Sequence, residues 1–285
     1  HPVNPEATPS FKLPWFIKVP AKVLSALSAE LATKFALSLF FKPLKFKIPS
    51  RELTMRESAE VYELLTEKAS DFKVFEHKGP GPKVLMIHGW SGRASQFFKI
   101  WERLAAEGFH LVAIEAPGHG DHLGGKTHML EFVDAIDDTV KRFGKFDYAI
   151  GHSLGGMALF NALKRDIWFS KLVIIGSPAN ISNVVQDFVG NIQMPSKIGA
   201  KIVSYIEQRY QLKASEASSD YLCQIYRPEG LIIHDRFDQD VPVENARNMH
   251  AKWKDSQYLE TVGLGHRKVL MDSKVIDRIY DFFKN

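Results

Sequence analysis

The chain has 285 residues, 45% of them hydrophobic and 25% charged, an ordinary composition for a folded globular protein that excludes global disorder. The single cysteine, Cys223, excludes an intramolecular disulfide and a cysteine-based zinc site, and we expect it to be an inert apolar residue. The net charge of +4 is uneven, because residues 1–50 carry seven lysines against two acidic residues. The remainder is nearly neutral and has no basic stripe for nucleic acid, whereas the basic N-terminal arm could meet an anionic lipid surface.

Residues 1–70 are predicted to form an N-terminal arm with helices that dock on the body. Five prolines predict irregular structure over residues 1–20. Residues 21–41 predict a helix whose apolar side chains share one face: Leu24, Leu27, Leu31 and Phe35. A second helix is expected over Arg51–Lys68.

An interfacial membrane helix is the alternative for this arm, with peripheral contact through residues 10–47. A transmembrane span is not expected, because Glu30 and Lys34 interrupt the apolar stretch Val23–Phe41. We expect a cytoplasmic protein that could associate with a membrane. The first residue is His1 and not Met, which leaves open whether a leader precedes it.

Short apolar runs and amphipathic stretches alternate from residue 71 to the end, which predicts a mostly parallel sheet covered by helices on both faces. The expected strands are Phe72–Glu76, Lys83–His88, Leu111–Glu115, Tyr148–Gly151, Leu172–Gly176, Gly230–His234 and Tyr258–Val262. The expected helices are Gln96–Ala106, Met129–Phe143, Leu154–Lys164, Glu244–Lys254 and Asp272–Phe283. In such a sheet the functional groups gather beyond the carboxyl ends of the strands.

A G-x-S-x-G motif lies where one predicted strand turns into a helix, at Gly151, Ser153 and Gly155. Glycines are needed there because side chains on a sharp turn would collide with the adjacent strand and helix. The turn lifts the serine hydroxyl out of the sheet, at the positive end of the helix. A serine nucleophile also needs a base and an acid that orients the base, in the chain order Ser, acid, His. The segments His234–Pro242 and Thr261–His266 each begin at the end of a predicted strand and supply candidates for both.

The set of motifs resembles the serine hydrolases of the α/β-hydrolase superfamily, over about residues 70–285. The matching segments are His88-Gly89-Trp90, Ala116-Pro117-Gly118-His119-Gly120, Gly151-His152-Ser153-Leu154-Gly155-Gly156, Asp238-x-x-Val241-Pro242 and Gly263-x-Gly265-His266. The resemblance implies an α/β-hydrolase domain over residues 71–285 with a small helical cap inserted at about 180–228. It implies Ser153 as the nucleophile, Asp238 as the acid and His266 as the base.

The same resemblance places the oxyanion hole at two backbone N–H groups, those of Trp90 and Leu154. The candidates for the substrate pocket are His88, Trp90, His152 and Met157, although both histidines are interpreted first as structural hydrogen-bonding residues.

Three positions depart from the pattern of the superfamily. The acid-bearing turn begins His234-Asp235 where relatives have His-Gly, so Asp235 and Asp240 are rival acids to Asp238. The fourth strand of the pattern ends in Glu115 instead of Asp, which we expect to be a structural change. His119, Asp121, His122 and His128 invite a metal interpretation, but the first histidine of the corresponding metal box would fall at Pro117, so no metal and no cofactor are expected.

The predicted function is hydrolysis of small-molecule carboxylic esters of small or medium acyl groups, through an acyl-enzyme. The alternatives are a thioesterase, amidase or C–C hydrolase with the same triad, and a membrane-surface lipase or lysophospholipase. A non-catalytic ligand-binding protein of this fold is the alternative from a different class. Acyl specificity and oligomeric state do not follow from the sequence.

Overall fold

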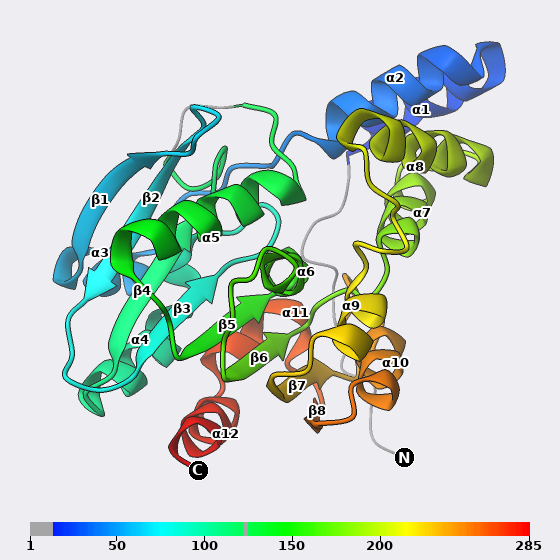
Figure 1. Cartoon of the computed structure of the whole chain (residues 1–285). Coiled ribbons are helices and arrows are strands. Elements are labelled where there is room, and N and C mark those ends of the chain that lie inside the picture. The colour runs from blue at the N-terminus through cyan, green and yellow to red at the C-terminus, as the bar shows by residue number, and fades with distance from the viewer. Residues whose placement is uncertain (1–13, 122–124) are drawn as a thin grey trace.

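The computed structural model describes residues 14–121 and 125–285, and a single eight-stranded sheet runs through it (Figure 1). The strands are β1 (Glu60–Leu65), β2 (Asp71–His77), β3 (Lys83–Ile87), β4 (His110–Glu115), β5 (Tyr148–His152), β6 (Lys171–Ile175), β7 (Glu229–Asp235) and β8 (Ser256–Thr261). Their spatial order is β1-β2-β4-β3-β5-β6-β7-β8, and only the pairs β1–β2 and β2–β4 are antiparallel. The predicted mostly parallel sheet is therefore confirmed.

Helices cover both faces of the sheet, which explains why the parallel strands read as continuous apolar runs. One face carries α5 (Met129–Phe143), α6 (Leu154–Leu163), α9 (Ser219–Ile225) and α10 (Glu244–Lys252). The other carries η2 (Ala94–Phe97), α4 (Phe98–Ala106), η3 (Val269–Met271) and α12 (Ser273–Lys284). The two cores contain large aromatic residues that are fully buried, such as Phe160 and Trp253 on the first face and Phe97 on the second. Cys223 is buried in α9, and burial raises the pKa of its thiol to about 12, so it is the inert residue that was expected.

Four helices pack together away from the sheet, and we call them the helical annex: α1 (Trp15–Leu27), α2 (Ala29–Phe40), α7 (Ile181–Asn191) and α8 (Ser196–Tyr210). Figure 1 shows α1 and α2 lying against α8, so the N-terminal helices meet the insertion after β6. Phe40 of α2 contacts Phe188 of α7 with ring centroids 5.1 Å apart. Within the described residues, no helix is long and apolar enough to span a membrane.

The predicted start of the first helix was wrong, because α1 begins at Trp15 and includes Pro20. Pro20 lies on an exposed side of the helix, where water can hydrate the carbonyl that loses its partner. The single helix predicted over residues 21–41 is also divided at Ser28. There the backbone is extended and the Oγ atom accepts from Leu31 N at 3.4 Å as the N-cap of α2.

The helix predicted over Arg51–Lys68 was wrong in its second half. Residues 50–58 form η1 (Ser50–Glu52) and α3 (Leu53–Ser58), but Glu60–Leu65 is strand β1, which pairs with β2. Tyr62 and Leu64 pack on the core while Val61 and Leu65 are exposed, which is the alternation of an edge strand. The sheet therefore begins inside the segment that the sequence attributed to the N-terminal arm.

Candidate active site

The turn between β5 and α6 holds Ser153 in a strained conformation. Its φ of 53° and ψ of −123° lie in a region that L-residues rarely adopt. Ser153 N donates to Ile175 O at 2.9 Å, which fixes the turn to the end of β6. A Cβ at Gly155 would lie 2.3 Å from the carbonyl oxygen of Ile87, so only glycine permits this close approach of helix to strand. The geometry is that of a nucleophile elbow.

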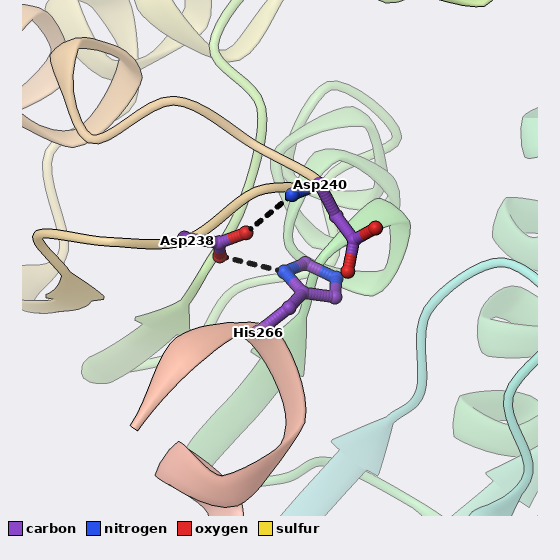
Figure 2. Close-up of side chains that lie close together, drawn as sticks. All are labelled: Asp238, Asp240 and His266. Atoms are coloured by element: carbon purple, nitrogen blue, oxygen red, sulfur yellow. Dashed lines mark hydrogen bonds and ion pairs between the residues drawn. The ribbon is translucent and has the colours of Figure 1, made fainter. Parts of the chain in front are cut away.

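Asp238 and His266 form a hydrogen-bonded pair next to this turn (Figure 2). His266 Nδ1 donates to Asp238 Oδ2 at 2.7 Å, so Nε2 is the ring nitrogen on the side away from Asp238. The pair lies over the backbone of Gly176, the residue after Ile175. A Cβ built on Gly176 would lie 3.3 Å from His266 Nδ1 and 3.4 Å from Asp238 Oδ2. Ser153 is thus bonded to Ile175, and the pair lies over the next residue, Gly176.

The Asp238 carboxylate is held on both oxygens. Its Oδ1 atom accepts from the backbone N–H groups of Asp240 and Val241, at 2.8 and 2.9 Å. Burial would raise the pKa of Asp238, but the hydrogen bond and charge of His266, with the Val241 N–H, outweigh it and lower the pKa. Asp238 therefore stays ionised beside the imidazole.

The two rival acids, Asp235 and Asp240, differ in where they lie relative to His266. Asp235 Oδ2 accepts from Thr261 Oγ1 and Leu264 N, both at 2.9 Å, and its Oδ1 accepts from Phe237 N at 3.0 Å. Asp235 thus ties the acid-bearing turn to the turn that presents His266. Asp240 contributes its backbone N–H to Asp238, and its carboxylate lies beside the His266 ring, on the side away from Asp238 (Figure 2).

A metal interpretation of this group is weak. Asp238, Asp240 and His266 each have one ligand atom within 4.8 Å of the others. Both oxygens of Asp238 already accept hydrogen bonds, and His266 Nδ1 is used as a donor, so the group is organised as an acid–imidazole pair.

The described residues of the predicted metal cluster, His119, Asp121 and His128, each contact a different partner. His119 Nδ1 bonds Pro117 O at 2.9 Å, Asp121 pairs with Arg56, and the ring of His128 lies 4.4 Å from that of Tyr210. His122 lies outside the described residues. Glu115, the unusual residue at the end of β4, is fully buried and pairs with Arg56 at 3.0 Å.

Trp90 and Leu154 lie on the two segments that border Ser153. A Cβ at Gly89 would lie 2.6 Å from Ser153 Cβ, so the Gly89–Trp90 backbone passes directly over the elbow, while Leu154 opens α6. Within residues 14–121 and 125–285, neither Trp90 N nor Leu154 N has a hydrogen-bond partner. Both donors are therefore available to a developing oxyanion.

The two histidines of the predicted pocket are engaged with backbone. His88 is fully buried: its Nε2 accepts from Ala116 N at 3.0 Å, so its Nδ1 carries the hydrogen that is donated to Gly89 O at 2.7 Å. His152 Nε2 lies 2.8 Å from the carbonyl oxygen of His266. Burial, aided by neighbouring His266, lowers the pKa of His152 to about 3. Both rings are thus neutral and position other site residues. Met157 is buried in α6, at 1% exposure.

Residues 41–47, which we call the strap, also border the site, a contact that the sequence did not predict. Leu44 N donates to Ser91 Oγ at 2.9 Å, one residue after Trp90. The guanidinium of Arg267, next to His266, lies 5.3 Å from the ring centroid of Phe46. Contacts between residues so far apart in the sequence leave no local sequence pattern. In the structure Ser91 has a positive φ of 55°, a conformation that residues other than glycine rarely adopt.

The fold and the site define an α/β hydrolase. The alpha/beta hydrolase family model matches residues 84–256, and the chain belongs to this family. An esterase from Rhodococcus sp. ECU1013 has a similar structure, with a TM-score of 0.61 and 14% identity over 79% of this chain and 98% of that one.

Two curated relatives match shorter regions. A pimeloyl-[acyl-carrier protein] methyl ester esterase of Vibrio vulnificus strain YJ016 is 29% identical over 104 residues, 36% of this chain and 40% of the relative. Phospholipase YtpA of Bacillus subtilis strain 168 is 27% identical over 95 residues, 30% of this chain and 36% of the relative. The chain thus spans two fifths or less of the curated relatives that it matches.

Proposed function

We propose that this protein is a serine hydrolase that cleaves carboxylic esters of small or medium acyl groups through an acyl-enzyme, and that Ser153, His266 and Asp238 are its triad. One observation carries the proposal: the Asp238–His266 hydrogen bond lies over Gly176, beside the strained turn that presents Ser153. The family to which the chain belongs and the esterases among the similar proteins support the reaction class.

The mechanism follows from this arrangement. His266 Nε2 removes the proton from Ser153 Oγ as the oxygen attacks the ester carbonyl, and Asp238 holds the imidazole in the tautomer that leaves Nε2 unprotonated. The N–H groups of Trp90 and Leu154 donate to the oxyanion of the tetrahedral intermediate. His266 then gives the proton to the leaving alcohol, and the acyl group stays on Ser153. A water molecule, deprotonated by His266, hydrolyses the acyl-enzyme and restores the serine.

Intact-mass analysis after treatment with a fluorophosphonate tests the nucleophile, because such probes react with activated serines. Wild type is expected to gain one adduct, and Ser153→Ala none. Ser170→Ala removes an exposed serine outside the site and should still be labelled. An adduct that persists on Ser153→Ala would refute the assignment. A folded wild-type protein without any adduct would favour the non-catalytic binding protein.

A panel of substrates with one shared acyl group then tests the bond that is cleaved. The proposal expects the oxygen ester to be hydrolysed with the highest kcat/KM. A preference for the matched thioester or amide would refute the ester assignment and leave the serine mechanism in place.

A further inference from the structure

Helix α1 exposes an apolar face that nothing in the described chain covers. Its members are the largest exposed apolar residues of the helix: Trp15, Phe16, Val19, Val23 and Leu27. Their exposed fractions run from 52% to 75%. At about 100° of rotation per residue they fall within an arc of roughly 120° on one side of the helix. We call this the outer face of α1.

The opposite side of α1 already serves the packing of the annex. Ala21 is fully buried, and Ile17 and Leu24 pack against the same core, which includes Val185 and Ile202 of the insertion. The exposed apolar residues are therefore additional to those the fold needs. An ordinary surface helix would carry polar residues there.

The charge at the border of the outer face indicates what it contacts. Lys18 and Lys22 are one turn apart along one border of the apolar arc, and α1 has no acidic residue. In the part of the chain that the structure describes, neither lysine takes part in an ion pair, whereas Lys34 of α2 is paired with Glu30 at 2.7 Å. An apolar face edged by uncompensated lysines complements a surface that is apolar within and anionic at its boundary.

We propose that the outer face of α1 docks on an anionic lipid bilayer, with α1 lying in the plane of the surface. The apolar side chains would enter the boundary between headgroups and acyl chains, and Lys18 and Lys22 would lie at the level of the lipid phosphates. Trp15 and Phe16, whose rings meet edge to face at 6.3 Å, stand at the start of the helix. Aromatic side chains of this kind are favoured at the membrane–water interface.

The docking face is connected to the candidate active site. Helix α2 continues into the strap, whose Phe46 contacts Arg267. Leu44 of the strap bonds Ser91 in the segment 88–93, which carries the proposed oxyanion donor Trp90 and which we call the oxyanion loop. A bilayer bound by α1 would therefore contact the annex, which the strap connects to the rim of the candidate site. The delivery of a lipid ester to Ser153 would rest on the proposed function, but the docking itself does not.

Co-sedimentation of the full chain with vesicles tests the docking. The vesicles are pure phosphatidylcholine or phosphatidylcholine with one third phosphatidylglycerol, each at low and at raised salt. Wild type is expected to sediment with the anionic vesicles and to bind less at raised salt. The double variant Trp15→Ser/Phe16→Ser should bind at least about tenfold more weakly. Lys18→Glu/Lys22→Glu should lose a similar factor on anionic vesicles only.

A matched control separates this face from general hydrophobicity. Trp168→Ser removes a tryptophan that is 55% exposed and precedes β6, and its binding should equal that of wild type. Wild type that stays in the supernatant with anionic vesicles would overturn the proposal, as would equal binding by Trp15→Ser/Phe16→Ser. A lipid-free dimer that dissociates in this variant would overturn it too, because a second copy would then cover the face.

Labelling of the same samples distinguishes this proposal from the proposed function. The α1 variants should react with the fluorophosphonate like wild type, since α1 contains no residue of the candidate site. Vesicle binding by a protein that is not labelled would leave the docking in place and refute only the hydrolase.

Discussion

We call the sheet, with the helices on its two faces and residues 50–58, the body. The body and the helical annex both bury apolar side chains, but among the described residues only the body also buries charged side chains. Its fixed polar pairs include Glu52 with Arg93 and Asp238 with His266, all at 10% side-chain exposure or less. The buried residues of the four annex helices are all apolar or glycine. The Glu30–Lys34 pair of α2 is exposed. Buried polar groups require fixed partners, whereas an apolar core mainly requires volume and pattern. The body therefore requires a fixed geometry, whereas the annex requires mainly that its apolar core is filled.

The largest expected effect comes from the hydrogen-bonded pair of Asp238 and His266. Asp238→Asn should lower kcat for ester hydrolysis by about 10³- to 10⁴-fold, because the imidazole loses the partner that sets its tautomer. Asp240→Asn keeps the backbone N–H that Asp238 needs and should cost less than about tenfold. Steady-state kinetics on one ester, with circular dichroism to verify folding, measures both. Equal losses in the two variants would mean that Asp240 shares the role of the acid.

The buried pair of Glu52 and Arg93 is expected to have the next largest effect, on stability. Glu52 accepts from Arg93 through both carboxylate oxygens at 2.6 Å and from Ser95 Oγ at 2.8 Å. Glu52→Gln would leave the Arg93 charge buried without compensation, and should lower the free energy of unfolding by about 3–5 kcal/mol.

The exposed pair of the annex provides the contrast to Glu52. Glu30→Gln breaks the Glu30–Lys34 pair and should change the free energy of unfolding by less than about 0.5 kcal/mol. Urea titration measures both variants. Comparable losses would contradict the division between body and annex.

The body should also be the acid-sensitive part, because its buried histidines are held neutral. Burial lowers the pKa of His88, His152 and His234, and that of His152 falls to about 3. With a folded-state pKa below the ordinary value, the unfolded chain binds more protons between the two values, so stability falls as the pH drops below about 6.5. For His152 alone the loss between pH 7 and pH 5 should be roughly 2 kcal/mol.

His152→Gln tests this linkage. Urea unfolding at pH 7 and pH 5 should show a smaller decrease on acidification in the variant than in wild type, whatever the stability of each at pH 7. An identical pH dependence in the two proteins would show that His152 does not carry this part of the acid sensitivity.

Features that are determined locally could be predicted from the sequence, and features that depend on distant partners could not. The elbow, the acid turn and the turn before His266 are each defined by short segments in which glycine, proline and the reactive residue must have fixed spacing, so their positions follow from local chemistry. The start of α1 and strand β1 depend on packing partners elsewhere: exposure permits Pro20, and pairing with β2 converts residues 60–65 to strand. The connecting function of Asp235 also required the fold, because its partners Thr261 and Leu264 are 26 and 29 residues away.

The smallest effect on catalysis should come from the strap, where the body meets the annex. Ser91 Oγ accepts from Leu44 N at 2.9 Å, and Ser91 follows the proposed oxyanion donor Trp90. Ser91→Ala removes one exposed hydrogen bond, worth about 0.5–1 kcal/mol, and should lower kcat two- to fivefold, because the oxyanion loop loses one of its supports. Because the strap would support a transition-state donor and not the bound ester, KM should stay the same while kcat falls. A change confined to KM would instead place the strap in the wall of the substrate pocket, and the annex would then act on substrate entry and not on the oxyanion.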